Sequence, residues 1–252
     1  MKKLTYSVLG QGIPLILLHG WGMGSPFLTP LAKALSEYYQ VYLIDLPGYG
    51  NNFLSSCPDN LEELCEELLK IFPPEAIWVG WSMGGLIAQK VACRYPDRVL
   101  ALIILNSSPA FMEKENWPGI KDKQSQMLFK HVHLNPKEAL ERFIFWQFSI
   151  LPCTRHLYKE FKSHFPISQD ALLKGLYWLK DTDLRLELQC VPCPTLMIFG
   201  KCDPLVPAEI KNLIKPHFQS SIMAESLDAS HIPFLSHKAQ CIHLIQGFLN
   251  VI

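Results

Sequence analysis

The sequence has no excess of charge of either sign. Lysine and arginine together number 23, as do aspartate and glutamate, and charged residues make up only 18% of the 252 residues. A chain without net charge has no overall attraction for nucleic acid or for an anionic membrane surface. We therefore expect neither of them as a partner.

Long hydrophobic runs are missing as well. Lys2 and Lys3 near the N-terminus are followed by no apolar segment of the kind that a secretory signal peptide contains. The nearest apolar run, residues 13–18, is too short to span a membrane. These features predict a cytoplasmic protein, and we further expect it to be a monomer.

The eight cysteines show no pattern that predicts a disulfide framework. Cys190 and Cys193 form a lone C-x-x-C, with no second pair and no histidine at zinc spacing nearby. A redox or metal role for this pair is an alternative, but we favour a loop that leads into a strand. We therefore expect reduced thiols and no metal site.

Short apolar runs alternate with helical patterns along most of the chain. Apolar residues make up 49% of the sequence, which suits a globular protein with a substantial core. The predicted strands are residues 15–18, 41–44, 76–79, 99–105 and 194–200, and the predicted helices are residues 30–39, 61–72, 84–92, 208–214 and 239–249. Fully apolar strands separated by helices are typical of parallel sheets. The predicted fold class is therefore α/β, with a mostly parallel central sheet and helices on both faces.

Residues 110–188 break this alternation. They contain no clear apolar strand and are dominated by helical periodicity. A helical block between two strands predicts a cap inserted over the carboxyl edge of the sheet, where open α/β sheets bind ligands. We therefore expect an α/β core of residues 1–109 and 189–252, with residues 110–188 as an α-helical cap.

Residues 80–84 read G-x-S-x-G and directly follow the predicted strand 76–79. A strand that turns sharply into a helix needs small residues at the corner, because larger side chains collide there. Ser82 is then held on a strained turn near a helix N-terminus, with its hydroxyl exposed. This pattern predicts a nucleophile elbow with Ser82 as the nucleophile.

A serine hydroxyl needs a base, and the base needs an orienting carboxylate. Asp203 lies just after the predicted strand 194–200, and His231 lies in a loop before the last predicted helix. The chain order of serine, acid and histidine is that of hydrolases with this elbow. Asp228 is the alternative acid, but it is too close to His231 in sequence for the two to lie on separate loops. We therefore predict Ser82, Asp203 and His231 as the catalytic triad.

The charge that develops on an attacked ester carbonyl needs two backbone donors. One candidate is the amide of Met83, directly after the nucleophile, and the other is the amide of Trp21, in the loop after the first predicted strand. His19, in the same loop, is expected to brace it rather than to transfer protons. The predicted reaction is attack by Ser82 with His231 as base, followed by hydrolysis of the acyl-enzyme by water. It requires no metal or organic cofactor.

With these residues in place, the sequence resembles the α/β-hydrolase family, and more narrowly the pimeloyl-[acyl-carrier protein] methyl ester esterases of biotin synthesis. The resemblance runs over nearly the whole chain. It is carried by residues 17–22, 45–50, 77–86, 107–109 and 117–120, and by Glu141, Arg142, Phe143 and Gln147. Trp78, Trp81 and the W-P-G-I of residues 117–120 are more specific to these esterases than the elbow is.

The resemblance implies a serine carboxylesterase that hydrolyses the methyl ester of a pimeloyl chain on acyl carrier protein. It also implies the positions that contact the substrate, which are Trp21, Ser82, Met83, Phe143, Gln147 and His231. A broader short-chain carboxylesterase or thioesterase without a carrier-protein partner is the alternative. A scaffold with a degenerate hydrolase fold is a third hypothesis, but the presence of serine, acid and histidine argues against it.

The predicted cap carries a local excess of positive charge. Residues 121–165 contain eight lysines and arginines against four acidic residues. Arg155, Lys159 and Lys162 are spaced to share one helical face. Acyl carrier protein is an acidic helical partner, so we predict that Arg142, Arg155 and Lys159 dock it. The alternative is a helix face that is merely solvated.

Overall fold

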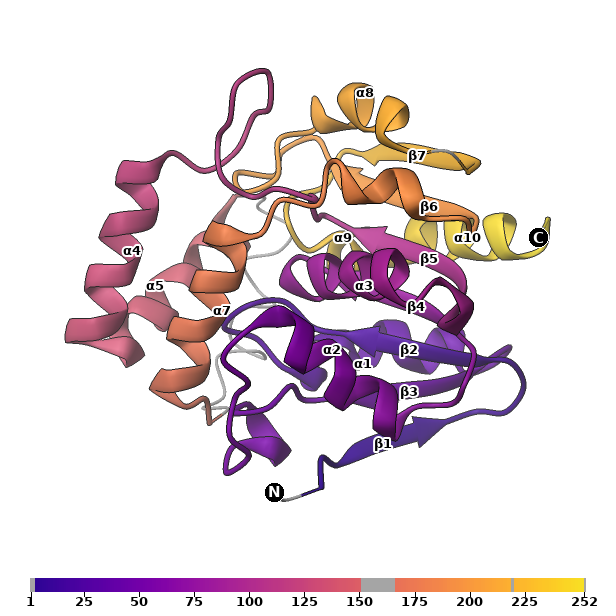
Figure 1. The fold of residues 1–252 in the computed structure, drawn as a ribbon, viewed down its shortest axis with the longest axis horizontal. Coiled ribbons are helices and arrows are strands. Elements are labelled where there is room, and N and C mark those ends of the chain that lie inside the picture. Colours follow the sequence, from indigo (N-terminus) through magenta and orange to yellow (C-terminus); the bar gives the residue numbers. More distant parts are fainter. Residues whose placement is uncertain (1–2, 151–165, 219, 252) are drawn as a thin grey trace.

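Seven strands form one sheet through the middle of the protein (Figure 1). The structure is a computed structural model, and it describes residues 3–150, 166–218 and 220–251. The strands are β1 (Tyr6–Leu9), β2 (Pro14–Leu18), β3 (Gln40–Ile44), β4 (Ala76–Trp81), β5 (Val99–Leu105), β6 (Thr195–Gly200) and β7 (Ile222–Leu227). Their order across the sheet is β1-β3-β2-β4-β5-β6-β7. The β1–β3 pair is antiparallel and the other pairs are parallel, so the expected mostly parallel sheet is confirmed.

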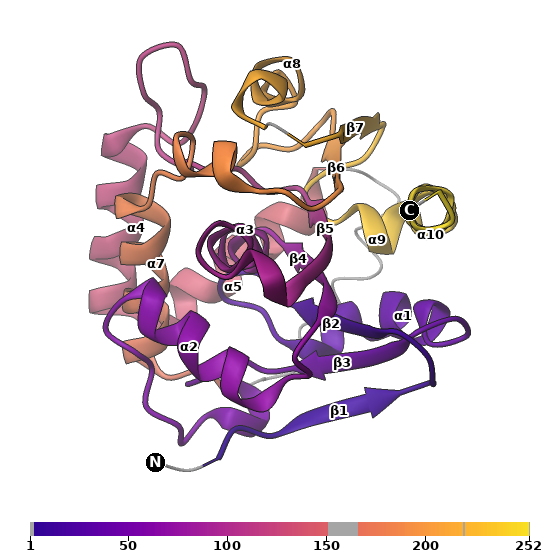
Figure 2. The ribbon, with the colours of Figure 1, turned by 45° about the vertical axis from the view of Figure 1, so that its right-hand side comes forward.

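The helices lie on both sides of this sheet (Figure 2). They are α1 (Ser25–Leu35), α2 (Leu61–Ile71), α3 (Met83–Arg94), α4 (Asp122–Leu134), α5 (Pro136–Ser149), α7 (Gln169–Asp181), α8 (Ile210–Ile214), α9 (Pro233–Ser236) and α10 (Lys238–Leu249), with short 3-10 turns η1 (Gly50–Asn52), η2 (Pro96–Arg98), η4 (Glu187–Cys190) and η5 (Lys215–His217). The alternation of strands and helices that the sequence predicts is therefore present.

Every residue of β4 and of β6 is buried, because both faces of these central strands are covered. Side chains on one face, such as Trp78 and Leu102, pack in a cluster with residues of α2, α3 and α8. Side chains on the other face, such as Val79 and Ile103, pack with residues of α1, α9 and α10. This two-sided burial explains the continuous apolar runs in the sequence.

The sequence pattern does not predict the two edge strands, β1 and β7. Three of the four residues of β1 are exposed, and β7 is mostly half-buried. An edge strand is covered incompletely, so it carries no continuous apolar run to reveal it.

The first helix differs from the prediction of residues 30–39. It begins at Ser25 and ends at Leu35. Pro26 lies in its first turn, where the missing N–H leaves no helical hydrogen bond unmade. Tyr38, which the sequence pattern places in the helix, is outside it and 58% exposed. The apolar face of the helix is instead built around residues such as Leu28 and Leu31.

Helices α4, α5 and α7 follow β5 and precede β6 in the chain, within the stretch 110–188 that we expect to form a cap. They lie together beside the carboxyl ends of the parallel strands (Figure 1). Helix α5 begins at a well-formed cap, because the Asn135 side chain accepts a hydrogen bond from the amide of Glu138 and Pro136 occupies the first turn. Among the described residues, no helix is long and apolar enough to cross a membrane.

Candidate active site

The turn between β4 and α3 holds Ser82 in a backbone conformation that few residues adopt. Its φ is 55° and its ψ is −121°, so it lies at positive φ although it is not glycine. The turn requires glycine on both sides. A Cβ added at Gly80 would lie 2.2 Å from the carbonyl oxygen of Gly84, and one at Gly84 would lie 2.3 Å from that of Leu18. A strained strand-to-helix corner of this kind carries the nucleophile in hydrolases that have such an elbow, and here it leaves Ser82 only 6% exposed.

Asp203 and His231 meet at the same edge of the sheet. Asp203 follows β6, His231 follows β7, and Nδ1 of His231 lies 2.7 Å from Oδ2 of Asp203. The other carboxylate oxygen, Oδ1, accepts hydrogen bonds from the amides of Leu205 at 2.8 Å and Val206 at 3.1 Å. Both ring and carboxylate are almost completely buried. The contact with Asp203 fixes the ring and leaves Nε2 as the nitrogen that can take up a proton.

The alternative acid, Asp228, is engaged elsewhere. Its side chain is 82% exposed and pairs with Lys201 at 2.8 Å. The geometry therefore brings Asp203, and not Asp228, to the imidazole of His231.

His231 is held beside the nucleophile elbow by Trp81. The indole nitrogen of Trp81 donates a 2.7 Å hydrogen bond to the carbonyl oxygen of His231, and the two rings are 5.6 Å apart. Trp81 directly precedes Ser82, so this bond ties the histidine loop to the elbow. Within the described ranges, no hydrogen bond joins Ser82 to His231; such bonds are often long in hydrolases without substrate.

The loop after β2 passes against the elbow. A Cβ added at Gly20 would lie 3.0 Å from Cβ of Ser82, and Gly22 has a φ of 68°, which favours glycine. Neither the amide of Trp21 nor that of Met83 donates to a backbone carbonyl of the described chain. These two amides therefore have no backbone acceptor within the described chain, and their role as oxyanion donors remains a proposal.

His19 braces this loop. Its Nε2 accepts a hydrogen bond from the amide of Leu46, and its Nδ1 bonds to the carbonyl oxygen of Gly20, both at 2.9 Å. An amide can only donate and a carbonyl can only accept, so these contacts require a neutral ring with its proton on Nδ1. Burial lowers the pKa of His19 below its ordinary value of 6.5, although nearby Asp45 acts in the opposite direction.

A cavity of about 500 Å³ lies between this elbow and the helices α4, α5 and α7. Its lining is mostly apolar and comes from these helices, from the segment 111–120 and from the loop after β6; it comprises Trp21, Ser82, Phe111, Met112, Gly119, Ile120, Gln124, Ser125, Met127, Leu128, His131, Ala139, Arg142, Phe143, Trp146, Leu176, Leu179, Lys180, Pro204 and Leu205. The proposed nucleophile thus faces a space suited to an apolar chain.

The six positions that the family resemblance assigns to the substrate divide into two groups. Trp21, Ser82 and Phe143 line the cavity, and the rings of Trp21 and Phe143 meet edge to face with centroids 4.8 Å apart. Met83, Gln147 and His231 are buried and do not line it. Of these three, Met83 and His231 belong to the elbow and the histidine loop, whereas Gln147 lies on α5.

The structure describes one of the predicted docking residues, Arg142. Arg142 lies on α5 at the cavity, its side chain is 70% exposed, and it pairs with Glu138 at 2.5 Å. Arg155, Lys159 and Lys162 lie outside the described residues.

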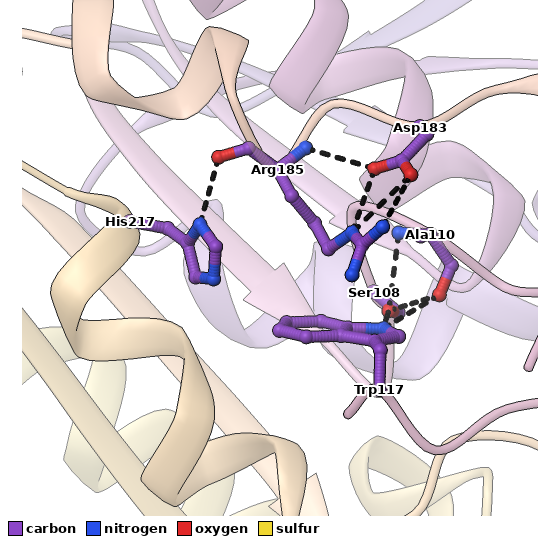
Figure 3. A network of polar contacts seen from close by, with 6 residues as sticks. All are labelled: Ser108, Ala110, Trp117, Asp183, Arg185 and His217. Carbon is purple, nitrogen blue, oxygen red and sulfur yellow. Dashed lines mark hydrogen bonds and ion pairs between the residues drawn. The ribbon is translucent and has the colours of Figure 1, made fainter. Parts of the chain in front are cut away.

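The segment 111–120 is fastened to the core by Trp117 (Figure 3). Its indole nitrogen donates to Oγ of Ser108 at 3.2 Å and to the carbonyl oxygen of Ala110 at 3.0 Å. The guanidinium of Arg185 lies 5.4 Å from the centre of the indole ring, and Asp183 pairs with this guanidinium at 2.8 Å. The W-P-G-I motif therefore holds one wall of the cavity in place.

Sequence reasoning missed Asn106, which contacts the predicted acid. This residue follows β5 directly, and its Nδ2 donates to Oδ2 of Asp203 at 2.5 Å and to the carbonyl oxygen of Ser230 at 3.1 Å. A polar side chain directly after a buried strand, at the edge where ligands bind, was the available signal.

The C-x-x-C pair forms no disulfide in the structure. Cys190 is exposed at the end of η4, whereas Cys193 is buried in the loop before β6. Burial raises the pKa of the Cys193 thiol to about 11, which keeps it protonated and unreactive. Across the described ranges, no group of three or more His, Cys, Asp or Glu side chains is placed to bind a metal ion.

Comparison with known proteins places the chain in a family. A family model described as alpha/beta hydrolase fold matches residues 13–238. The pimeloyl-[acyl-carrier protein] methyl ester esterase of Shewanella woodyi is 36% identical, over 99% of this chain and 98% of its own. The protein of the same name from Hamiltonella defensa is 38% identical, over 98% of this chain and 97% of its own.

Solved structures share the fold at lower identity. An esterase from Exiguobacterium antarcticum superposes with a TM-score of 0.84 over 98% of this chain and 95% of its own, at 21% identity. An enol-lactonase from Burkholderia xenovorans gives a TM-score of 0.81 over 98% of this chain and 96% of its own, also at 21% identity. These two likenesses concern the fold alone. From the family model and the full-length relatives, the chain belongs to the α/β-hydrolase fold family and, within it, to the family of the pimeloyl-[acyl-carrier protein] methyl ester esterases.

Proposed function

We propose that this protein is a serine carboxylesterase that hydrolyses the methyl ester of pimeloyl-[acyl-carrier protein] to pimeloyl-[acyl-carrier protein] and methanol. The observation that carries the proposal is that Ser82, on a strained elbow, lines a largely apolar cavity of about 500 Å³. The full-length relatives from Shewanella woodyi and Hamiltonella defensa, whose names state this activity, support it.

In the proposed mechanism, Oγ of Ser82 bonds to the ester carbon while Nε2 of His231 takes the hydroxyl proton. The amides of Trp21 and Met83 stabilise the oxyanion. Collapse of the intermediate breaks the bond to the methoxy oxygen, which leaves as methanol with the proton from His231. Water then attacks the acyl-enzyme by the same route, and the product carboxylate and free Ser82 are released. Asp203 holds the ring of His231 throughout, at the 2.7 Å contact described above.

The cavity suits a pimeloyl chain for a physical reason. A pimeloyl chain buries about four more carbon groups than an acetyl group does, which contributes about 3 kcal/mol and distinguishes the two by roughly a hundredfold. The chain end is an uncharged methyl ester before hydrolysis and a carboxylate afterwards. A carboxylate loses its hydration in an apolar cavity, so the lining favours the substrate over the product.

The carrier protein is proposed to dock on the basic face that includes Arg142, Arg155 and Lys159. Of these residues the structure describes Arg142, which is exposed and lies at the cavity, so a carrier protein on this face could deliver its acyl chain to Ser82. Charge complementarity across such a rim acts mainly on the association rate.

The docking proposal is tested with Arg142→Glu, assayed on the carrier-bound ester and on a small nitrophenyl ester. We expect kcat/KM to fall about tenfold or more for the carrier-bound ester and to change little for the small one. Lys33→Glu makes the same charge change on α1, at an exposed lysine outside the cavity, and should leave both rates unchanged. Equal losses of Arg142→Glu on both esters would argue against docking at this face.

The function itself is tested by complementation of a biotin auxotroph that lacks its own esterase. We expect growth without biotin when this protein is expressed, and no growth with Ser82→Ala. Failure of the unmodified protein to support growth, with full activity on small esters, would favour the broader short-chain carboxylesterase or thioesterase.

The proposal extends to three further points. Residues 110–188 act as a cap that covers the acyl chain, the protein works as a monomer, and it is located in the cytoplasm, where acyl carrier protein would be encountered. The helices α4, α5 and α7 over the cavity support the first of these points.

A further inference from the structure

We infer that Asn106 is a positioning residue for ester hydrolysis: its side-chain amide fixes the carboxylate of Asp203, which in turn orients His231. This inference rests on the proposed function, because it assigns Asn106 a task only if Asp203 and His231 act on Ser82. It concerns a residue that does not line the cavity and therefore acts through Asp203.

Asn106 contacts the carboxylate oxygen of Asp203 that faces His231. Oδ2 of Asp203 receives Nδ2 of Asn106 at 2.5 Å and lies 2.7 Å from Nδ1 of His231. Its partner Oδ1 is held by two backbone amides of the loop that carries Asp203 itself. Asn106 is thus a side-chain donor from another strand that sets the direction in which Oδ2 points.

Asn106 also reaches the loop that carries the base. The same Nδ2 donates to the carbonyl oxygen of Ser230, the residue before His231, at 3.1 Å. The backbone amide of Asn106 bonds to the carbonyl oxygen of Ile198 on β6 at 2.8 Å. One fully buried side chain therefore links the end of β5 to both loops that supply the acid and the base.

The backbone at this position is consistent with a functional constraint. Asn106 has a φ of 44°, one of three non-glycine residues at positive φ in the described chain, and Ser82 is another. Positive φ costs about 1 kcal/mol or more for most residues, although asparagine tolerates it better than most. Such strain persists where the surrounding contacts demand it, and here those contacts are the two bonds of Nδ2.

Loss of the Asn106 side-chain amide is expected to shift the pH dependence of activity upward. The N–H group stabilises the ionised carboxylate, so without it the carboxylate attracts a proton on the neighbouring imidazole more strongly. The base then becomes available only at higher pH. Two other charged side chains lie on the same loops, Lys201 and Asp228, but they are exposed and paired with each other.

The test uses Asn106→Asp and Asn106→Gly, assayed for kcat, KM and the pH dependence of kcat/KM on a small nitrophenyl ester. Aspartate keeps the size of the side chain, and both residues tolerate positive φ. We expect kcat to fall about tenfold or more in Asn106→Gly, because a hydrogen bond to a charged group is lost, with KM unchanged. We expect the acidic limb of kcat/KM to move up by about one pH unit in Asn106→Asp, where a second carboxylate faces the first, and by less in Asn106→Gly.

Asn212 supplies the matched control. It is an exposed asparagine on α8 that does not line the cavity, so Asn212→Asp makes the same change of charge away from the acid. This variant should keep the kinetics and the pH profile of the unmodified protein.

Folded Asn106 variants with an unshifted acidic limb and unchanged kcat would overturn the inference. If one of the two variants fails to fold, the other variant provides the test. Ser82→Ala in the same assay distinguishes failure of the proposed function from failure of the role assigned to Asn106. Activity in Ser82→Ala contradicts the proposed function, whereas an inactive Ser82→Ala beside unaffected Asn106 variants contradicts the role of Asn106 alone.

Discussion

The indole nitrogen of Trp21 donates a 2.8 Å hydrogen bond to the carbonyl oxygen of Leu172, which ties the proposed oxyanion loop to α7. Helix α7 also lies against Trp21 and Met83 at Gly175. A Cβ added there would lie 2.7 Å from Cδ1 of Trp21 and 3.0 Å from Sδ of Met83. Both residues of the proposed oxyanion hole therefore pack against the single helix α7. Movement of α7 away from the core would disturb the loop and the elbow together.

Gly175→Ala is predicted to lower kcat about tenfold. The new methyl group collides with Trp21 and Met83, and a loss of one well-placed oxyanion donor costs a hundredfold or more, so partial displacement gives a smaller effect. The stability gain of about 1 kcal/mol from alanine in a helix is offset by the collision. Steady-state kinetics and thermal unfolding of the variant check both parts.

The control for this substitution is Gly247→Ala. Gly247 lies within α10, and an added Cβ there meets nothing within 4 Å. We expect this variant to gain roughly 0.5–1 kcal/mol of stability and to keep full activity. Equal kinetics of the two alanine variants would refute the proposed support of the oxyanion loop by α7.

Asp203→Asn is predicted to lower kcat by roughly a thousandfold or more. An amide at this position no longer stabilises the imidazolium of His231 and favours the wrong tautomer, as is seen for hydrolytic triads in general. Asp228→Asn removes the nearby exposed carboxylate and should leave kcat unchanged, because that group pairs with Lys201 instead. A large loss in Asp228→Asn with little loss in Asp203→Asn would reverse the assignment of the acid.

The free energy of unfolding is predicted to fall as the pH drops below about 6.5, with His19 as one cause. The pKa of this buried histidine is lower in the folded state than its ordinary value of 6.5. The unfolded chain therefore binds the proton first, so the stability that His19 contributes is present above pH 6.5 and is lost as the pH falls toward its folded pKa. Urea unfolding between pH 5 and 8 measures the slope.

His19→Gln should reduce that slope, since no buried imidazole is then left to protonate at this position. His133, an exposed histidine at the end of α4, provides the control His133→Gln. An unchanged slope in His19→Gln would show that other groups cause the acid sensitivity.

Arg185→Met is predicted to raise KM for long-chain esters several-fold and to leave short-chain esters nearly unaffected. The guanidinium packs on Trp117 and pairs with Asp183, so its loss loosens the segment 111–120 that walls the cavity (Figure 3). A looser cavity wall raises KM most for long acyl chains, because these contact the wall and short chains do not. The comparison of acetyl and longer acyl nitrophenyl esters measures the difference.

Arg94→Met is the matched control for this prediction, because Arg94 also pairs with an acid, Glu62, but on α3 away from the cavity. A uniform rise of KM for all chain lengths in Arg185→Met would indicate a general loss of structure rather than a looser wall.

The sequence predicts the parts of this protein that depend on local pattern. Strands buried on both faces, such as β4 and β5, carry continuous apolar runs, and the corner at Ser82 requires glycines at fixed positions. The edge strands β1 and β7 escape detection because one side of each is open to water. The start of α1 is misplaced because the predicted helix begins at Pro30, whereas this proline lies inside a helix that begins at Ser25.

Contacts between distant segments are beyond the reach of a single sequence. Chain order alone suggests that Asp203 and His231 share an edge, and the structure places them 2.7 Å apart, whereas their catalytic roles stay predictions. The bond from Asn106 to Asp203 joins residues 97 positions apart; the position of Asn106 after a buried strand indicates the sheet edge but not its partner. The same holds for the contact of Trp21 with α7, which depends on the packing of the helices over the core.

The most direct measurement is the mass of purified pimeloyl-[acyl-carrier protein] methyl ester after incubation with the protein. With the unmodified chain, we expect the carrier protein to lose the mass of one methylene group, as the methyl ester becomes an acid, and methanol to appear in equal amount. With Ser82→Ala, folded to the same degree, we expect the mass to stay unchanged. Demethylation by Ser82→Ala at the rate of the unmodified protein, or an intact ester with both, would contradict hydrolysis by Ser82.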